Sequence, residues 1–477
     1  MKTKMRYKDL HINRYLIFII FTLFTLVLFA CTPYSEPVES SIPTDPIDPT
    51  TPVETQIPDE NTKLYRTDVR SDVSQVVLDE LELGFLFFWE LANDNRESNG
   101  YGLIPDRFNT FTGNPGSVSS IASVGYGLSA LPIGIENNWV TRQEAEERAY
   151  YTLVTFQNMQ RTHGFWYHFV NMSTGLREWN SEVSIIDSAI FINGALTVGR
   201  YFGGRVQQLA YQLYEEIEWN WYFDPVNNMF YMGYRPESGF EGYWDHYGEQ
   251  LMVYVLAAGS PNYKVGKGAF QFMKFSSTLT SSTDNYDSFY LTWTGSLFTY
   301  QYSHAWVDFQ SYVDWQGYSW FDNSVNAVDA AIAYAKTRTD YIGIHEHSWG
   351  MSASDGPGGY VGPYGSAPSA GSAHVVDGTV PAYGAIGSIV FRPQQAISAM
   401  ENYRTYERFW SVYGFKGAYN LDYSSNGWFA NDIIGIDKGI SILMIENYMS
   451  QMIWKIYMEV PYVIDGLEAL DFTQIDT

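Results

Sequence analysis

Helical segments of two kinds alternate along most of this chain, and the alternation restricts the folds that it can adopt. Residues 72–92, 141–160 and 206–219 carry one apolar and one charged face, as expected of helices at a surface. Residues 119–136 and 182–201 are apolar nearly all round, which predicts helices that are covered on every side. This order predicts an all-α fold with an inner ring of helices shielded by an outer ring. Further helices are predicted at 250–258, 319–336, 393–413 and 436–458, and short strands at 165–170 and 230–234.

The stretch from Gly233 to Leu256 combines a run of aromatic residues with a single acid on an apolar helix that is predicted from Tyr247 onward. Glu249 on such a helix must be paired, protonated or exposed to a cavity, because an unpaired buried charge is too costly. The preceding aromatic residues, among them Trp244, would form the wall of that cavity. We interpret Glu249 as a catalytic acid at the floor of a sugar-binding cleft. A structural role, as a turn cap or as the partner of an arginine, is the alternative.

Two other apolar segments carry acids in the same way. Asp187 lies among isoleucines, and Glu182 lies near the start of the same helix, where the helix dipole also favours an acid. Asp437 stands between two glycines, where the backbone can approach a ligand closely. Glu446 follows on a buried stripe of that helix. For Asp187 and Glu446 a structural ion pair is the competing interpretation.

Paired carboxylates in an aromatic-lined cavity are typical of glycoside hydrolysis. One acid, with its pKa raised by burial, protonates the leaving oxygen, while the other activates water or attacks directly. Metal chemistry has little support, since His345 and His347 in the sequence HEH are more simply explained as surface or loop histidines. No HExxH, EF-hand, GxSxG or phosphate-binding glycine motif occurs, and we expect neither a metal nor a cofactor.

The N-terminal residues predict where the protein is located in the cell. Residues 1–31 combine a basic start, an apolar core and the sequence LFAC, and so are predicted to be a signal peptide of the bacterial lipoprotein type, with Cys31 as the lipidated residue. A membrane-spanning anchor is the alternative, but the apolar run is short for it. Residues 32–62 are rich in Pro, Ser, Thr and acids, which predicts a disordered tether. Residues 63–477 are then one catalytic domain.

The net charge of −25 argues against nucleic acid or anionic lipid as a partner and suits a neutral substrate. We expect a monomer that lies outside the cytoplasm, in the periplasm, at the outer membrane or at the cell surface. Its only contact with the bacterial membrane is expected to be its lipid anchor.

Six long motifs follow one another between about Asp68 and Leu470. They are SVSSIASVGYGLSALPIGIE (117–136), SEVSIIDSA (181–189), LFTYQYSHAWVDF (297–309), WGMSASDGPGGY (349–360), DGTVPAYGAIGS (377–388) and DIIGIDKGISILMIENY (432–448). In this order they resemble the bacterial endo-β-1,2-glucanase family, whose glucoamylase-like domain also occurs in cyclic β-1,2-glucan synthases.

The resemblance implies an (α/α)6 toroid that cleaves β-1,2-glucan to sophoro-oligosaccharides with inversion and without a metal. Glu249, in YGEQL where relatives have YSEAL, corresponds to the general acid, and Asp437 in GIDKG is the candidate base. A glycan-binding lipoprotein without turnover and a transglycosylase for the same linkage are the alternatives. The remaining residues expected to bind substrate or tune the site are Glu182, Asp187, Trp244, Tyr247, His304, Trp306, Trp349, Asp355, Tyr360 and Glu446.

Overall fold

The computed structural model describes residues 63–371 and 374–475. The predicted signal peptide, Cys31 and the tether lie outside these residues. Among the described residues, no helix is both long enough and apolar enough to cross a bilayer.

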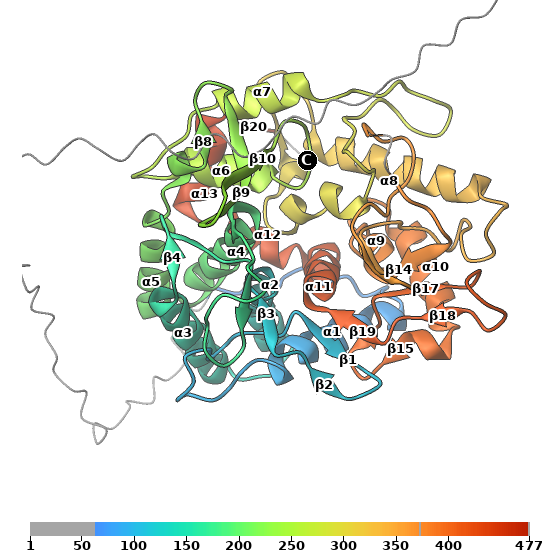
Figure 1. The fold of residues 1–477 in the computed structure, drawn as a ribbon, viewed down its shortest axis with the longest axis horizontal. Helices are drawn as coiled ribbons and strands as arrows, with labels where there is room; N and C mark the ends of the chain where they lie inside the picture. Colours follow the sequence, from blue (N-terminus) through green and yellow to red (C-terminus); the bar gives the residue numbers. More distant parts are fainter. Residues whose placement is uncertain (1–62, 372–373, 476–477) are drawn as a thin grey trace, which may run out of the picture. The chain divides into compact units, whose positions relative to one another are not determined.

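Helices of the two predicted kinds form two rings (Figure 1). In the inner ring α2 (Ile121–Glu136) packs on α4 (Ile185–Phe202) and on α11 (Gly435–Ser450), and all three are buried along almost their whole length. In the outer ring α1 (Gln75–Glu90) covers α2 and α11, and α5 (Gly204–Glu215) covers α4. Burial on every side explains why the inner helices have no polar face. The other α-helices are α3 (Arg142–Asn158), α6 (Leu251–Gly259), α7 (Gly268–Ser276), α8 (Trp320–Thr337), α9 (Ala382–Ile386), α10 (Pro393–Arg404), α12 (Met452–Tyr457) and α13 (Pro461–Ala469).

Several predicted helices end or break earlier than the sequence pattern suggested. The helix predicted at 393–413 ends at Arg404, and the one predicted at 436–458 is broken at Gln451, whose backbone is left-handed with φ 58°. That conformation stops the intrahelical hydrogen bonds and redirects the chain into α12. The stretch 297–309 contributes short 3-10 turns, η2 (Leu297–Tyr300) and η3 (Tyr302–Ala305), of which η3 contacts α11. The sequence pattern did not indicate α7, α9 or α13.

Local caps fix where two helices begin. Thr141 and Glu144 form the predicted capping box of α3: the Thr141 hydroxyl accepts from the Glu144 N–H at 3.2 Å, and the Glu144 carboxylate accepts from the Thr141 N–H at 3.1 Å. In α4, the Ser184 hydroxyl accepts from the Asp187 N–H at 3.1 Å. A cap of this kind stabilises a protein by about 1 kcal/mol. The cap on α4 also holds a candidate site residue in the first helical turn.

Short strands lead directly into four inner helices and pair with strands from other parts of the chain. Each pairing is antiparallel, so each of these four helices begins beside a strand from another part of the chain. The pairs are β3 (Val118–Ser120) with β6 (Phe169–Asn171) before α2, β7 (Val183–Ser184) with β9 (Met229–Arg235) before α4, β14 (Thr379–Pro381) with β17 (Ala418–Asn420) before α9, and β19 (Asp432–Ile434) with β1 (Arg107–Asn109) before α11. The other strands are β2 (Asn114–Pro115), β4 (Arg161–Thr162), β5 (Phe165–Trp166), β8 (Phe223–Asp224), β10 (Gly239–Tyr243), β11 (Tyr312–Val313), β12 (Ser354–Gly356), β13 (Gly359–Val361), β15 (Trp410–Ser411), β16 (Gly414–Phe415), β18 (Trp428–Phe429) and β20 (Thr473–Gln474).

A buried ion pair fastens the first turns of α11 to the outer ring. Lys438 on α11 is paired with Glu80 on α1, and its Nζ also donates to the Phe415 carbonyl at 3.1 Å. The second Glu80 oxygen accepts from the Phe415 N–H at 2.9 Å. With both charges buried and hydrogen-bonded, removal of either partner would leave the other uncompensated. The Lys438–Glu80 pair therefore fixes the position of the neighbouring Asp437 in the first turn of α11.

Candidate active site

Three predicted site carboxylates gather around one tyrosine of α2. Burial raises the pKa of Tyr126 well above its usual range, and the charges of Asp437, Asp187 and Glu249 raise it further. The Tyr126 hydroxyl is buried and has no hydrogen-bond partner among the described residues. Segments that lie far apart in the sequence thus bring their acids to one place, as the inner-ring hypothesis requires.

Glu249 lies in the turn before α6 and not on the helix itself, because α6 begins only at Leu251. Ser303 fixes that turn: its hydroxyl donates to the Glu249 carbonyl at 2.6 Å and accepts from the Met252 N–H at 3.0 Å. The Glu249 side chain is half-buried, and no side chain in the described part of the protein pairs with its carboxylate. Burial, helped by the charge of Asp187, raises its pKa to about 7. A carboxyl group of this kind can carry a proton at neutral pH and donate it.

Asp437 lies in the first turn of α11 and is only 6% exposed. Its Oδ2 has no hydrogen-bond partner among the described residues. Burial raises the pKa of Asp437 well above its usual range; the charges of Asp355 and Asp106 add to this, whereas Arg107 and Lys438 oppose it. A base must be ionised, so the two cations are the groups that favour this role. The charge of Asp437 in turn raises the pKa of Tyr302, Tyr360 and Tyr383, so these phenols lie within reach of its electrostatic field.

Arg107 on β1 joins three carboxylates from separate parts of the chain. Its guanidinium lies 3.1 Å from Asp106, 3.1 Å from Asp355 and 3.3 Å from Asp432. Burial raises the pKa of Asp355, while Arg107 lowers it. The sequence analysis did not identify Arg107, whose only signal is an Asp-Arg pair in a segment without periodicity. It is the cation that keeps this acidic edge of the site together.

His168 bridges Glu182 and Asp187. Its Nδ1 lies 2.9 Å from Glu182 and its Nε2 lies 3.5 Å from Asp187, while Arg235 contacts Glu182 at 3.2 Å. Burial raises the pKa of Glu182, but His168 and Arg235 outweigh it and lower the pKa to about 2. One ligand atom from each of the three bridged residues lies within 4.8 Å of the others, a spacing that a metal could use. Since both histidine nitrogens already face carboxylates, ion pairing accounts for the group.

Four residues that we expected to contact a sugar are fully buried, and that expectation is wrong for them. His304 bonds Ser324 at 2.9 Å, and burial lowers its pKa to about 3. Trp306 donates to Ser129 at 2.8 Å and lies against Tyr126. Trp349 and Tyr247 are likewise packed inside the core, and Trp244 is 8% exposed. Side chains in these positions support the inner ring from behind and cannot stack on a glucose ring.

Glu446 is also misplaced for substrate contact. It lies nine residues after Asp437 on α11, about 13 Å further along the helix axis. It is completely buried, with Arg66 at 2.9 Å and Ser450 at 2.5 Å. The structure therefore favours the ion-pair alternative. By contrast, Tyr360 on β13 is 58% exposed and pairs in register with Asp355 on β12, so both remain at the site.

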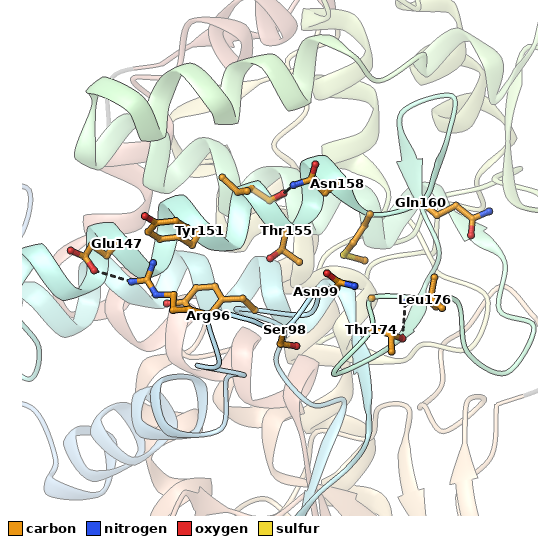
Figure 2. A pocket seen from close by; sticks show the side chains of 14 residues that line it. Arg96, Ser98, Asn99, Glu147, Tyr151, Thr155, Asn158, Gln160, Thr174 and Leu176 are labelled. Atoms are coloured by element: carbon orange, nitrogen blue, oxygen red, sulfur yellow. Dashed lines mark hydrogen bonds and ion pairs between the residues drawn. The ribbon is translucent and has the colours of Figure 1, made fainter. Parts of the chain in front are cut away.

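A groove of about 730 Å³ lies elsewhere, between α3 and residues 96–101 and 174–176 (Figure 2). Arg96 lies over the rings of Tyr101 and Tyr151 and is paired with Glu147 at 2.8 Å. None of the predicted site residues lines this groove. The carboxylate cluster is thus a separate feature.

Comparisons with known proteins agree with this architecture. Residues 241–461 match the family described as "Putative glucoamylase". The exo β-1,2-glucooligosaccharide sophorohydrolase (non-reducing end) of Parabacteroides distasonis is 23% identical over 438 residues, a match covering 82% of this chain and 57% of that protein. This chain therefore spans little more than half the length of that relative.

Solved structures extend the likeness to the whole fold. One of the same glucoamylase description, from Bacteroides uniformis, is 27% identical with a TM-score of 0.72, and the match covers 85% of this chain and 99% of that one. An endo-β-1,2-glucanase from Chitinophaga pinensis, in complex with sophorotriose and glucose, is 24% identical with a TM-score of 0.73, covering 84% and 98%. Residues 241–461 thus match the glucoamylase family model, and the chain has the (α/α)6 fold that these solved structures share.

Proposed function

We propose that this protein hydrolyses β-1,2-glucan to sophoro-oligosaccharides by acid/base catalysis with inversion. The observation that carries the proposal is the convergence of Glu249, Asp187 and Asp437 on Tyr126. Glu249 and Asp437 have no ion-pair partner in the described part of the chain, whereas Asp187 has His168 at 3.5 Å. Carboxyl groups left unpaired in this way cost stability, which is expected of groups kept for catalysis.

Glu249 is the general acid in this proposal. Its proton goes to the glycosidic oxygen as the bond from that oxygen to the anomeric carbon breaks. A pKa of about 7 leaves a large share of Glu249 protonated at neutral pH, so the donor is available without an extreme environment.

Asp437 is the general base. In the ionised form, favoured by Arg107 and Lys438, it takes a proton from a water molecule, whose oxygen bonds to the anomeric carbon from the opposite face. The product end then has inverted configuration. Tyr360, which is 58% exposed, can hydrogen-bond to sugar hydroxyls.

The choice of linkage rests on relatives. The Parabacteroides distasonis protein is named as acting on β-1,2-glucooligosaccharides and the Chitinophaga pinensis protein as an endo-β-1,2-glucanase. One is an exo-acting and the other an endo-acting enzyme, so the proposal names the linkage and leaves product length to measurement. We further propose that the protein is a monomer held outside the cytoplasm by a lipid on Cys31.

The deciding experiment incubates the protein and the E249Q variant with linear β-1,2-glucan, and with β-1,3- and β-1,4-glucans as controls, followed by chromatography of the products. We expect short products from β-1,2-glucan only, none from E249Q, and an inverted anomer by NMR. Binding without shortened products would identify a glycan-binding protein. Larger or cyclic products with retained configuration would identify a transglycosylase.

A further inference from the structure

Trp179 has an unusual combination of exposure and backbone conformation. Its side chain is 64% exposed, and both Trp179 and the following Asn180 are left-handed, with φ 54° and φ 51°. The left-handed region is unfavourable for a bulky residue, and two such residues in succession persist only where the surroundings impose them. A tryptophan in this place does not serve local stability, which points to a function for its ring.

Two arginines impose this conformation. The Asn180 carbonyl accepts from Arg177 at 2.9 Å and from Arg235 at 3.0 Å. Arg235 also contacts Glu182 at 3.2 Å. The Arg235 guanidinium therefore contacts both Glu182 and the backbone next to Trp179. This shared contact fixes the position of the exposed Trp179 ring relative to Glu182.

A continuous series of rings connects Trp179 with the carboxylate cluster. Its indole lies 5.0 Å from the ring of Phe169, which stacks on His168 at 3.7 Å. His168 in turn contacts Asp187 at 3.5 Å, and Asp187 raises the pKa of Glu249. Trp179 is thus the exposed outer end of a series whose inner end lies beside the proposed general acid.

We infer that Trp179 is the stacking platform of a glucose-binding subsite at the edge of the active site, away from the cleaved bond. The inference rests on the proposed function. An exposed indole offers an apolar face for the C–H side of a glucose ring and an N–H for its hydroxyls. Arg177 is paired with Glu237, and Arg235 with Glu182 and Glu241. Among the described residues, this edge therefore offers no free cation to an anionic ligand and suits a neutral sugar.

The test measures binding by calorimetry in the E249Q background, where the ligand is not cleaved. The ligands are the disaccharide sophorose and a β-1,2-glucan of ten or more glucose units. W179A should weaken binding of the long chain about five- to tenfold, which corresponds to one aromatic contact, and leave sophorose unaffected. F275A is the matched control: Phe275 on α7 is 70% exposed and has its ring contact with Trp315 only. We expect it to bind both ligands as E249Q does.

W179G separates a binding role from a structural one, because glycine accepts the left-handed conformation without strain. We expect W179G to lose the same affinity while its thermal midpoint stays equal to that of the parent or rises. Unchanged affinity in W179A, with cleavage by the wild type intact, overturns the inference and leaves the proposed function standing. A lower midpoint in W179G also overturns it, since Trp179 would then be structural. A wild type that neither cleaves nor binds β-1,2-glucan overturns the proposed function and this inference together.

Discussion

The half-buried carboxyl of Glu249, which has no partner among the described residues, should make the wild-type protein less stable at high pH than the E249Q variant. Burial raises its pKa from the ordinary 4.5 to about 7, so the folded state holds this proton more tightly than the unfolded chain does. Between these two values the unfolded state loses the proton first, and stability falls as pH rises. The full pKa shift corresponds to a loss of at most about 3 kcal/mol in the free energy of unfolding at high pH. Since the side chain is half-buried and partly solvated, we expect about 1–2 kcal/mol.

Glutamine has nearly the same shape and never ionises, so E249Q should match the wild type near pH 4 and exceed it above pH 7. In a domain of about 410 residues we expect a rise in thermal midpoint of roughly 1–2 °C at pH 8. Differential scanning fluorimetry from pH 4 to pH 9 measures it, with E97Q, at an exposed loop position, as the control that should show no such trend. A difference independent of pH, or a wild type that is the more stable protein at pH 8, would refute the reasoning, because Glu249 would then have a partner for its charge.

Other measurements follow from the same geometry. The rate constant kcat/KM on β-1,2-glucan should fall above about pH 7 as Glu249 loses its proton, and a profile flat to pH 9 would exclude it as the acid. R107M should reduce kcat at least tenfold, because three carboxylates lose their shared cation, with R107K retaining more activity; equal activity in all three proteins would contradict this role. E80Q should lower the free energy of unfolding by about 3–5 kcal/mol by leaving Lys438 buried without a countercharge, and the double variant E80Q/K438M, measured by urea denaturation, should recover part of the loss. Cells expressing the protein should incorporate labelled palmitate into it, and labelling that survives C31S would place the lipid elsewhere.

Helices covered on all sides were predictable from sequence, since burial leaves a composition that surface helices do not have. Asp187 and Asp437 were found for the same reason: an acid is conspicuous in an apolar helix. Glu249 was singled out as well, although its helix begins at Leu251, four residues later than predicted, because a turn next to an apolar run has the same residue types as the run.

The buried aromatic residues show where this reasoning stops. Trp306 and Trp349 have the same local composition as residues that line a cleft, and only the three-dimensional packing reveals that they are fully buried. Arg107 and His168 were missed for a different reason. Their chemistry comes from partners such as Asp432, which a strand pairing brings from the other end of the chain. No local pattern carries that information.

The unbonded phenol of Tyr126 has a consequence for how the empty site responds to acid and base. The charges of Glu249, Asp187 and Asp437 all raise the pKa of Tyr126, and the charge of Asp187 also raises the pKa of Glu249, so a proton gained by Asp187 changes the electrostatic field at Glu249. Titration steps of Asp187 and Glu249 are therefore collective properties of the pair, and a midpoint observed by spectroscopy should not be assigned to either side chain alone. A ligand that enters among these residues would redistribute several protons at once, so proton uptake or release on binding, measured in buffers of different ionisation enthalpy, would report on the whole cluster.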